Sequence, residues 1–108
     1  MNCNSAYQKM KTITVYHVPH IKNRLSIYQH GILCMSSIEG RIKYDARIYV
    51  SITMEAIGID YVGYEAVDIW SFEMEESFLH KDQYSQNPSH FFIKVDINPN
   101  KICLEATL

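Results

Sequence analysis

The stretch from Thr12 to Pro19 constrains the fold more than any other part of this chain. Threonine and β-branched residues alternate along Thr12-Ile13-Thr14-Val15-Tyr16, a pattern typical of a half-buried β-strand. His17 follows, and Pro19 lacks the amide hydrogen that strand pairing requires, so we expect pairing to end there. His17 is therefore predicted to lie at the mouth of a sheet. Two interpretations of His17 stay open: a ligand-binding group, or a strand residue whose ring bonds a backbone carbonyl.

The other patterns predict an α+β fold in a single domain of 108 residues, with residues 1–11 loosely ordered. Ile21, Leu25 and Tyr28 recur at intervals of four and three, which predicts a helix over residues 20–29 that ends at His30-Gly31. We expect further strands over 47–51, 65–74, 91–95 and 102–106, a short helix over 54–57, polar loops over 36–45 and 75–88, and a turn over 97–101.

The segment 65–74 is the longest strand candidate. It carries apolar residues on both faces, which indicates a central strand, and Asp68 does not fit this pattern. Five apolar side chains on these elements are predicted to form the core: Val15, Leu25, Ile48, Trp70 and Phe92.

Composition excludes several classes of function. The net charge of −2 and a pI near 6.2 argue against broad electrostatic nucleic-acid binding. The sequence has no run of about 18 apolar residues and no apolar leader near its start, so we expect no membrane span and a cytoplasmic location. Three cysteines without a CxxC pair fit a reducing compartment, and no Cys or His residues stand at zinc-finger spacing, so no metal site is expected.

Several short motifs resemble small proteins of the ADP-ribosyltransferase fold. Val15-Tyr16-His17-Val18, the helix that follows and His30-Gly31-Ile32-Leu33 look like the opening of that family. Arg47-Ile48-Tyr49-Val50-Ser51 is similar to its second strand, a "YxS" motif followed by a helix. Ile97-Asn98-Pro99-Asn100-Lys101-Ile102 resembles the "IPPxxI" turn of many small members, including the RNA 2′-phosphotransferase-like group. The motifs occur in the family's order and span residues 13 to 106.

The resemblance implies a split β-sandwich of two small sheets packed face to face, with NAD lying across the split. His17 matches the histidine expected to hydrogen-bond the ribose on the nicotinamide side. Tyr49 matches a tyrosine expected to stack on nicotinamide, and Tyr61 would be the second stacking tyrosine. The alternative for both tyrosines is ordinary core packing.

The chain departs from the family at the third motif, where a carboxylate normally opens the strand before the proline turn. Here that strand opens with Ser89-His90, so His90 or Ser89 occupies the third position, and His90 is the candidate third catalytic residue. Neither supplies the negative charge that would stabilise an oxocarbenium-like ribose. The nearest acids are Asp82 and Asp96. Phosphotransferase relatives use basic residues instead, for which the candidates are Arg24, Arg41, Arg47 and Lys94.

Two classes of function follow from the resemblance. The first is a small protein that binds NAD or a related nucleotide, with weak or no transferase activity. If it is active, it would be an ADP-ribosyltransferase or an RNA 2′-phosphotransferase-like enzyme with a protein or nucleic-acid acceptor. The second is a catalytically silent member that binds a protein partner, as an interaction module or an inhibitor encoded by a mobile element.

Overall fold

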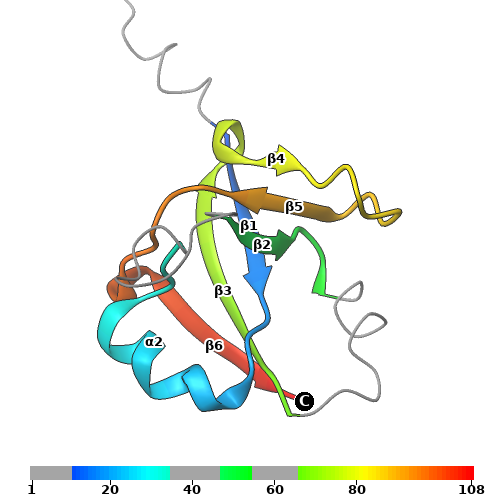
Figure 1. Cartoon of the computed structure of the whole chain (residues 1–108). Coiled ribbons are helices and arrows are strands. Elements are labelled where there is room, and N and C mark those ends of the chain that lie inside the picture. The colour runs from blue at the N-terminus through cyan, green and yellow to red at the C-terminus, as the bar shows by residue number, and fades with distance from the viewer. Residues whose placement is uncertain (1–10, 35–46, 55–65) are drawn as a thin grey trace, which may run out of the picture.

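The computed structural model describes residues 11–34, 47–54 and 66–108 (Figure 1). The chain is α+β, as predicted: its described residues form a six-stranded antiparallel sheet, one short α-helix and several 3₁₀ turns. In chain order the elements are β1 (Thr12–His17), η1 (Ile21–Asn23), α2 (Arg24–His30), β2 (Ile48–Ser51), β3 (Asp68–Glu75), η3 (Glu76–Phe78), β4 (His80–Lys81), β5 (His90–Ile93), η4 (Pro99–Lys101) and β6 (Ile102–Thr107).

The described strands form one sheet in the order β4-β5-β2-β1-β3-β6. The prediction of two separate sheets packed face to face is therefore wrong for these strands. The sheet is nevertheless divided in its middle, because β1 pairs with β3 at all six of its residues but with β2 only through Tyr16 opposite Ser51. Figure 1 shows the consequence: β2 and β5 run across the direction followed by β1 and β3. We call β4-β5-β2 and β1-β3-β6 the two half-sheets.

The chain after β1 continues beside β3. The Pro19 carbonyl oxygen accepts a hydrogen bond of 3.0 Å from the Asp68 amide, and the Ile21 amide donates to the Ala66 carbonyl oxygen at 3.3 Å. The backbone after His17 therefore stays with β3 and leaves β2. Pairing was predicted to end at Pro19, and this holds on the β2 side only; because the Pro19 backbone faces β3, its missing amide hydrogen does not account for the separation from β2.

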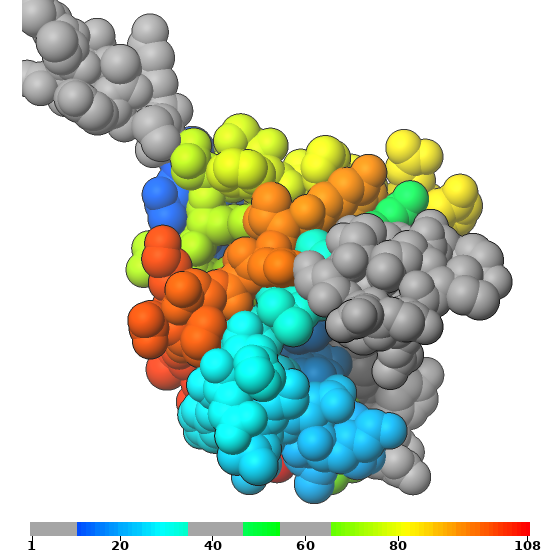
Figure 2. Space-filling view, turned by 60° about the vertical axis from the view of Figure 1, so that its left-hand side comes forward, coloured from blue at the N-terminus to red at the C-terminus, as the bar shows by residue number. Residues whose placement is uncertain are grey.

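The predicted helix over 20–29 is present as η1 followed by α2. The His20 ring accepts a hydrogen bond from the Lys22 amide and caps its start, and Gly31 ends it with a φ of +81°. Figure 2 shows α2 beside the η4 turn, which connects the strands of the two half-sheets. The C-terminal turn of α2 thereby lies against η4, at one face of the sheet.

The core confirms three of the five predicted side chains: Val15, Ile48 and Trp70 are buried. Leu25 is wrong, because 68% of its surface is exposed. Ile27 is the buried residue of α2, and a residue two positions away lies on nearly the opposite side of a helix. Phe92 is only half-buried, since it lies on the sheet face opposite to buried Ile93.

The other differences from the predicted elements concern their ends. Strand β3 begins at Asp68 and extends to Glu75, and the segment predicted as a loop over 75–88 contains η3 and β4. The predicted loop 36–45, most of the predicted helix 54–57 and residues 1–10 lie outside the described residues. No helix in the described ranges is long and apolar enough to cross a membrane.

Candidate functional site

His17 and Tyr49 meet where the two half-sheets separate. The last residue of β1, His17, directs its Nδ1 at the backbone carbonyl oxygen of Tyr49 on β2, at 2.9 Å. Continuing the register from Tyr16 opposite Ser51 would place Val18 opposite Tyr49, but β1 has already turned away. The imidazole therefore takes the place of a backbone donor. Of the two interpretations of His17, the structure shows the bond to a carbonyl, and it places this bond beside Tyr49.

The protonation of His17 follows from this contact. A carbonyl oxygen only accepts hydrogen bonds, so Nδ1 carries the proton in the neutral ring and Nε2 presents a lone pair. Burial lowers the pKa of His17 below its ordinary value, while the bond to the Tyr49 carbonyl acts in the opposite direction. At neutral pH the ring is therefore an uncharged hydrogen-bond acceptor, suited to a hydroxyl group of a ligand.

The Tyr49 side chain presents an aromatic surface on the sheet face opposite to the His17 side chain, because Tyr16 and not His17 stands opposite Ser51. Its side chain is 46% exposed, and its ring lies 6.1 Å from the Phe92 ring on β5 at an interplanar angle of 57°. Plain core packing is thus not the environment of Tyr49. An exposed ring supported on one side by another ring offers a surface on which a planar group can stack.

His90 lies farther along the same row of the sheet. Three residues occupy consecutive paired positions on β1, β2 and β5: Tyr16, Ser51 and His90. His90 therefore lies two strands from β1, and two ordinary strand spacings are roughly 10 Å. Its Nδ1 lies 2.6 Å from the Ser85 hydroxyl. His17, Tyr49 and His90 thus stand on three neighbouring strands, but contact is shown only between the first two.

The remaining predicted site residues have structural partners or lie outside the described residues. Tyr61 and Arg41 belong to the latter group. Arg24 forms a two-pronged ion pair with Asp68, at 2.7 and 2.9 Å, and Asp68 also accepts a 2.7 Å bond from the Thr107 hydroxyl. Asp68 is fully buried, and the Arg24 guanidinium holds its pKa below the usual range despite the opposing effect of burial. This network joins α2 to β3 and β6, so Arg24 positions the helix.

The two acids considered for the third motif also bond to backbone amides. The Asp96 carboxylate accepts a hydrogen bond of 2.7 Å from the Cys34 amide, and Asp82 accepts one of 3.1 Å from the Tyr84 amide. These bonds hold the turns in which the two acids stand. Neither acid is shown in contact with His17 or Tyr49.

A cluster of rings and cations that the sequence analysis did not identify lies next to Tyr49. The Arg47 guanidinium is 4.4 Å from the centre of the Phe92 ring, Lys94 Nζ is 5.8 Å from it, and the His80 ring stacks on it at 5.1 Å. We call Arg47, Tyr49, His80, Phe92 and Lys94 the aromatic–basic cluster. Residues 47, 49, 92 and 94 alternate on their strands and so share a sheet face, a signal that required knowledge of the β2–β5 register.

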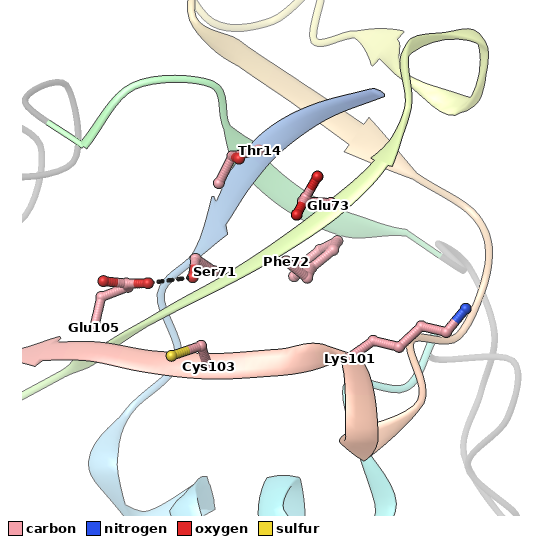
Figure 3. A pocket seen from close by; sticks show the side chains of 7 residues that line it. All are labelled: Thr14, Ser71, Phe72, Glu73, Lys101, Cys103 and Glu105. Atoms are coloured by element: carbon pink, nitrogen blue, oxygen red, sulfur yellow. Dashed lines mark hydrogen bonds between the residues drawn. The ribbon is translucent and has the colours of Figure 1, made fainter. Parts of the chain in front are cut away.

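A depression of about 560 Å³ lies over β1, β3 and β6 (Figure 3). The Ser71 hydroxyl donates a 2.5 Å hydrogen bond to the Glu105 carboxylate, with Cys103 beside them, and Figure 3 shows Lys101 extending away from the pair. Ser71 is only 6% exposed, so its hydroxyl is poorly placed to meet a substrate. This contact is a cross-strand link between β3 and β6.

Comparison of the chain with protein-family models, curated proteins and solved structures gives no match. Within residues 11–34, 47–54 and 66–108, no three His, Cys, Asp or Glu side chains gather as a metal site would require. The candidate site is accordingly defined by one contact, from the His17 ring to the Tyr49 backbone at the division of the sheet. Because Tyr16 stands opposite Ser51, the side chains of His17 and Tyr49 leave opposite faces of the sheet.

Proposed function

We propose that this chain is a small protein of the ADP-ribosyltransferase fold that binds NAD or a related nucleotide between its half-sheets, with weak or no transferase activity. The observation that carries the proposal is the contact between the His17 ring and the Tyr49 backbone at the division of the sheet. The motif resemblance singles out these two residues, 32 positions apart in the chain, and they stand together there. The contact joins the His17 ring to the Tyr49 backbone, so a nucleotide that used both side chains would have to reach around the division of the sheet.

The local chemistry of the two residues suits these roles. A neutral imidazole whose Nδ1 is occupied by a carbonyl oxygen leaves Nε2 to accept a hydrogen bond from a ribose hydroxyl. The exposed Tyr49 ring offers a stacking surface for nicotinamide. Both contacts support binding without supplying charge for the chemical step, and binding alone does not require such charge.

The absence of a carboxylate at the third position favours low activity. His90 opens β5, and its ring bonds to Ser85. Cleaving NAD at the ribose develops positive charge that a carboxylate would stabilise and a histidine would not. This observation also favours the second candidate function, a catalytically silent protein that binds a protein partner.

Calorimetric titration with NAD up to millimolar concentration tests the binding proposal. We expect measurable binding by the wild type and at least a tenfold loss in Tyr49→Ala, whose side chain is 46% exposed and whose folding is checked by a thermal melt. Tyr84→Ala is the matched control, because Tyr84 is 91% exposed and stands outside the division between β1 and β2. A folded wild type that binds no NAD would remove the nucleotide proposal and leave the protein-binding alternative.

Hydrolysis of labelled NAD tests the role of the third position. We expect little turnover by the wild type and an increase in His90→Glu, because one electrostatic group of this kind is commonly worth about 10²–10³ in rate. His90→Gln is the control for loss of the Ser85 contact without added charge. Robust turnover by the wild type would contradict the assignment of His90 to the carboxylate position.

A further inference from the structure

We propose that the aromatic–basic cluster on the β2–β5 face binds single-stranded nucleic acid. If the nucleotide-binding proposal above is correct, this strand would also be the acceptor, because Tyr49 belongs to both surfaces. The acceptor role rests on that proposed function, whereas binding of the strand to the cluster does not.

The geometry of the cluster combines stacked rings with cations at one place. The Phe92 ring has the Arg47 guanidinium 4.4 Å from its centre, the His80 ring stacked on it with 17° between the planes, and Lys94 Nζ at 5.8 Å. His80 is exposed, and so is half of the Tyr49 side chain, which leaves ring surface for further stacking. Unpaired bases stack on such rings irrespective of their identity, and cations beside the rings neutralise the phosphates.

The placement of two of the cations is itself unusual for a sheet. Arg47 and Lys94 directly continue the register in which Ile48 stands opposite Ile93. They are therefore like charges on opposing positions of neighbouring strands, an arrangement that destabilises a sheet. Both also lie within 6 Å of the centre of the same ring.

A hollow of about 440 Å³ extends this surface toward β4. Its described lining contains Arg47, Lys81, His80 and the rings of Phe92 and Tyr84, and no carboxylate. Lys81 Nζ donates to the carbonyl oxygens of residues 87 and 90 and lies 5.3 Å from the centre of the Phe91 ring. Because Lys81 pairs with Phe91 and His80 with Phe92, the Lys81 ammonium group lies on the other sheet face and is not part of the aromatic–basic cluster. Tyr84 is 91% exposed at the edge of the hollow.

These features favour a single strand over other polyanions. The net charge of −2 gives the chain no broad basic surface of the kind that a duplex requires. Exposed rings need bases that are not already stacked in a duplex, and only a single strand supplies them. An acidic peptide would use the cations but would leave the rings of Tyr49, His80 and Tyr84 without a role.

Fluorescence anisotropy with a labelled 12-nucleotide oligo(dT) and oligo(U) at several salt concentrations tests this proposal. We expect saturable binding that weakens with salt, and a salt slope smaller by about 0.7 in Lys94→Gln, since each phosphate contact to a single strand contributes that amount. Tyr84→Ala should weaken binding by about 5- to 150-fold, the range for losing one stacked base. Lys22→Gln, an exposed lysine on η1, is the matched control and should bind as the wild type does.

Competition assays and the NAD titration decide between the outcomes. Unlabelled single strands should displace the probe, whereas a duplex of equal length and polyglutamate of equal charge should not. Equal displacement by polyglutamate, equal losses in Lys22→Gln and Lys94→Gln, or no binding at low salt by folded protein would each overturn the proposal. Tyr84→Ala separates the two proposals, because it should impair oligonucleotide binding and leave NAD binding intact. Loss of NAD binding alone would refute only the nucleotide site.

Discussion

Replacing Gly31 by alanine tests how the C-terminal end of α2 is attached to the rest of the fold. Gly31 has φ +81° and ψ −165°, a backbone conformation that is essentially restricted to glycine. A Cβ at this position would overlap the carbonyl oxygen of Ile97 and would lie 2.9 Å from the backbone nitrogen of Pro99. Both neighbours are backbone atoms, so no side chain can rotate to make room.

The expected loss of stability can be assembled from these contacts. Holding an alanine in this backbone region costs about 1–3 kcal/mol, and overfilling a packed site costs about 1–3 kcal/mol more. The alanine chain also loses less entropy on folding, which offsets about 0.4–1 kcal/mol. We therefore expect Gly31→Ala to lower the free energy of unfolding by about 2–5 kcal/mol. A domain of this size is commonly stable by only about 5–15 kcal/mol.

Urea unfolding followed by Trp70 fluorescence measures this effect. Next to Gly31, Ile32 and Ile97 exchange two backbone hydrogen bonds of 3.0 and 2.8 Å, so displacing the turn also loosens the link from β5 to η4. Ser26→Ala, at an exposed position of the same helix, is the control and should change stability by less than about 0.5 kcal/mol. A Gly31→Ala protein as stable as this control would show that the turn does not adopt the conformation described.

Three further predictions concern stability and protonation. The pKa of Asp68 is lowered in the folded state, so its ion pair with Arg24 stabilises the fold fully above about pH 4, and this stabilisation is lost as the pH falls through the folded-state pKa. The free energy of unfolding should therefore fall less steeply with decreasing pH in Asp68→Asn than in the wild type. Trp70→Ala should cost on the order of 3–5 kcal/mol in a thermal melt because Trp70 is buried, and Leu25→Ala should cost less than about 0.5 kcal/mol because Leu25 is exposed; the reverse order would contradict the assigned helix phase. NMR titration should give His17 a pKa below 6.5 and a neutral ring protonated at Nδ1. Because the unfolded chain takes up the proton at a higher pH than the folded chain, the free energy of unfolding should fall as the pH drops below about 6.5. A neutral ring protonated at Nε2 would refute the bond to the Tyr49 carbonyl.

Local patterns in the sequence predicted the elements more successfully than their assembly. The alternation before His17 and the helix end at Gly31 each depend on neighbouring residues, and both are confirmed. The predicted end of pairing at Pro19 holds only toward β2, because the bonds to β3 continue past it. The side of α2 that faces the core was not predicted correctly. With only seven residues, the helix offered two apolar stripes, one through Leu25 and one through Ile27, and packing against the sheet selected the second.

Contacts between distant residues account for most of what was missed. Asp68 did not fit an apolar strand because its partner, Arg24, stands 44 positions earlier. A carboxylate in an otherwise apolar segment was a signal that a basic partner exists, but sequence alone left several cations as candidates. The aromatic–basic cluster depends in the same way on the pairing of β2 with β5, which no local pattern specifies.

The division of the sheet links the features of the candidate site to one backbone event. Because β1 turns toward β3 after His17, the Tyr49 carbonyl lacks a backbone donor from β1, and the His17 ring supplies one. The same departure leaves the Tyr49 side chain without a β1 neighbour at the paired position, and its ring, 46% exposed as a side chain, lies beside Phe92. The departure of β1 from β2 after His17 thus accounts both for the bond between the His17 ring and the Tyr49 carbonyl and for the missing β1 neighbour of Tyr49. The proposed binding of a ligand at this place therefore depends on the divided sheet as much as on the identity of either side chain.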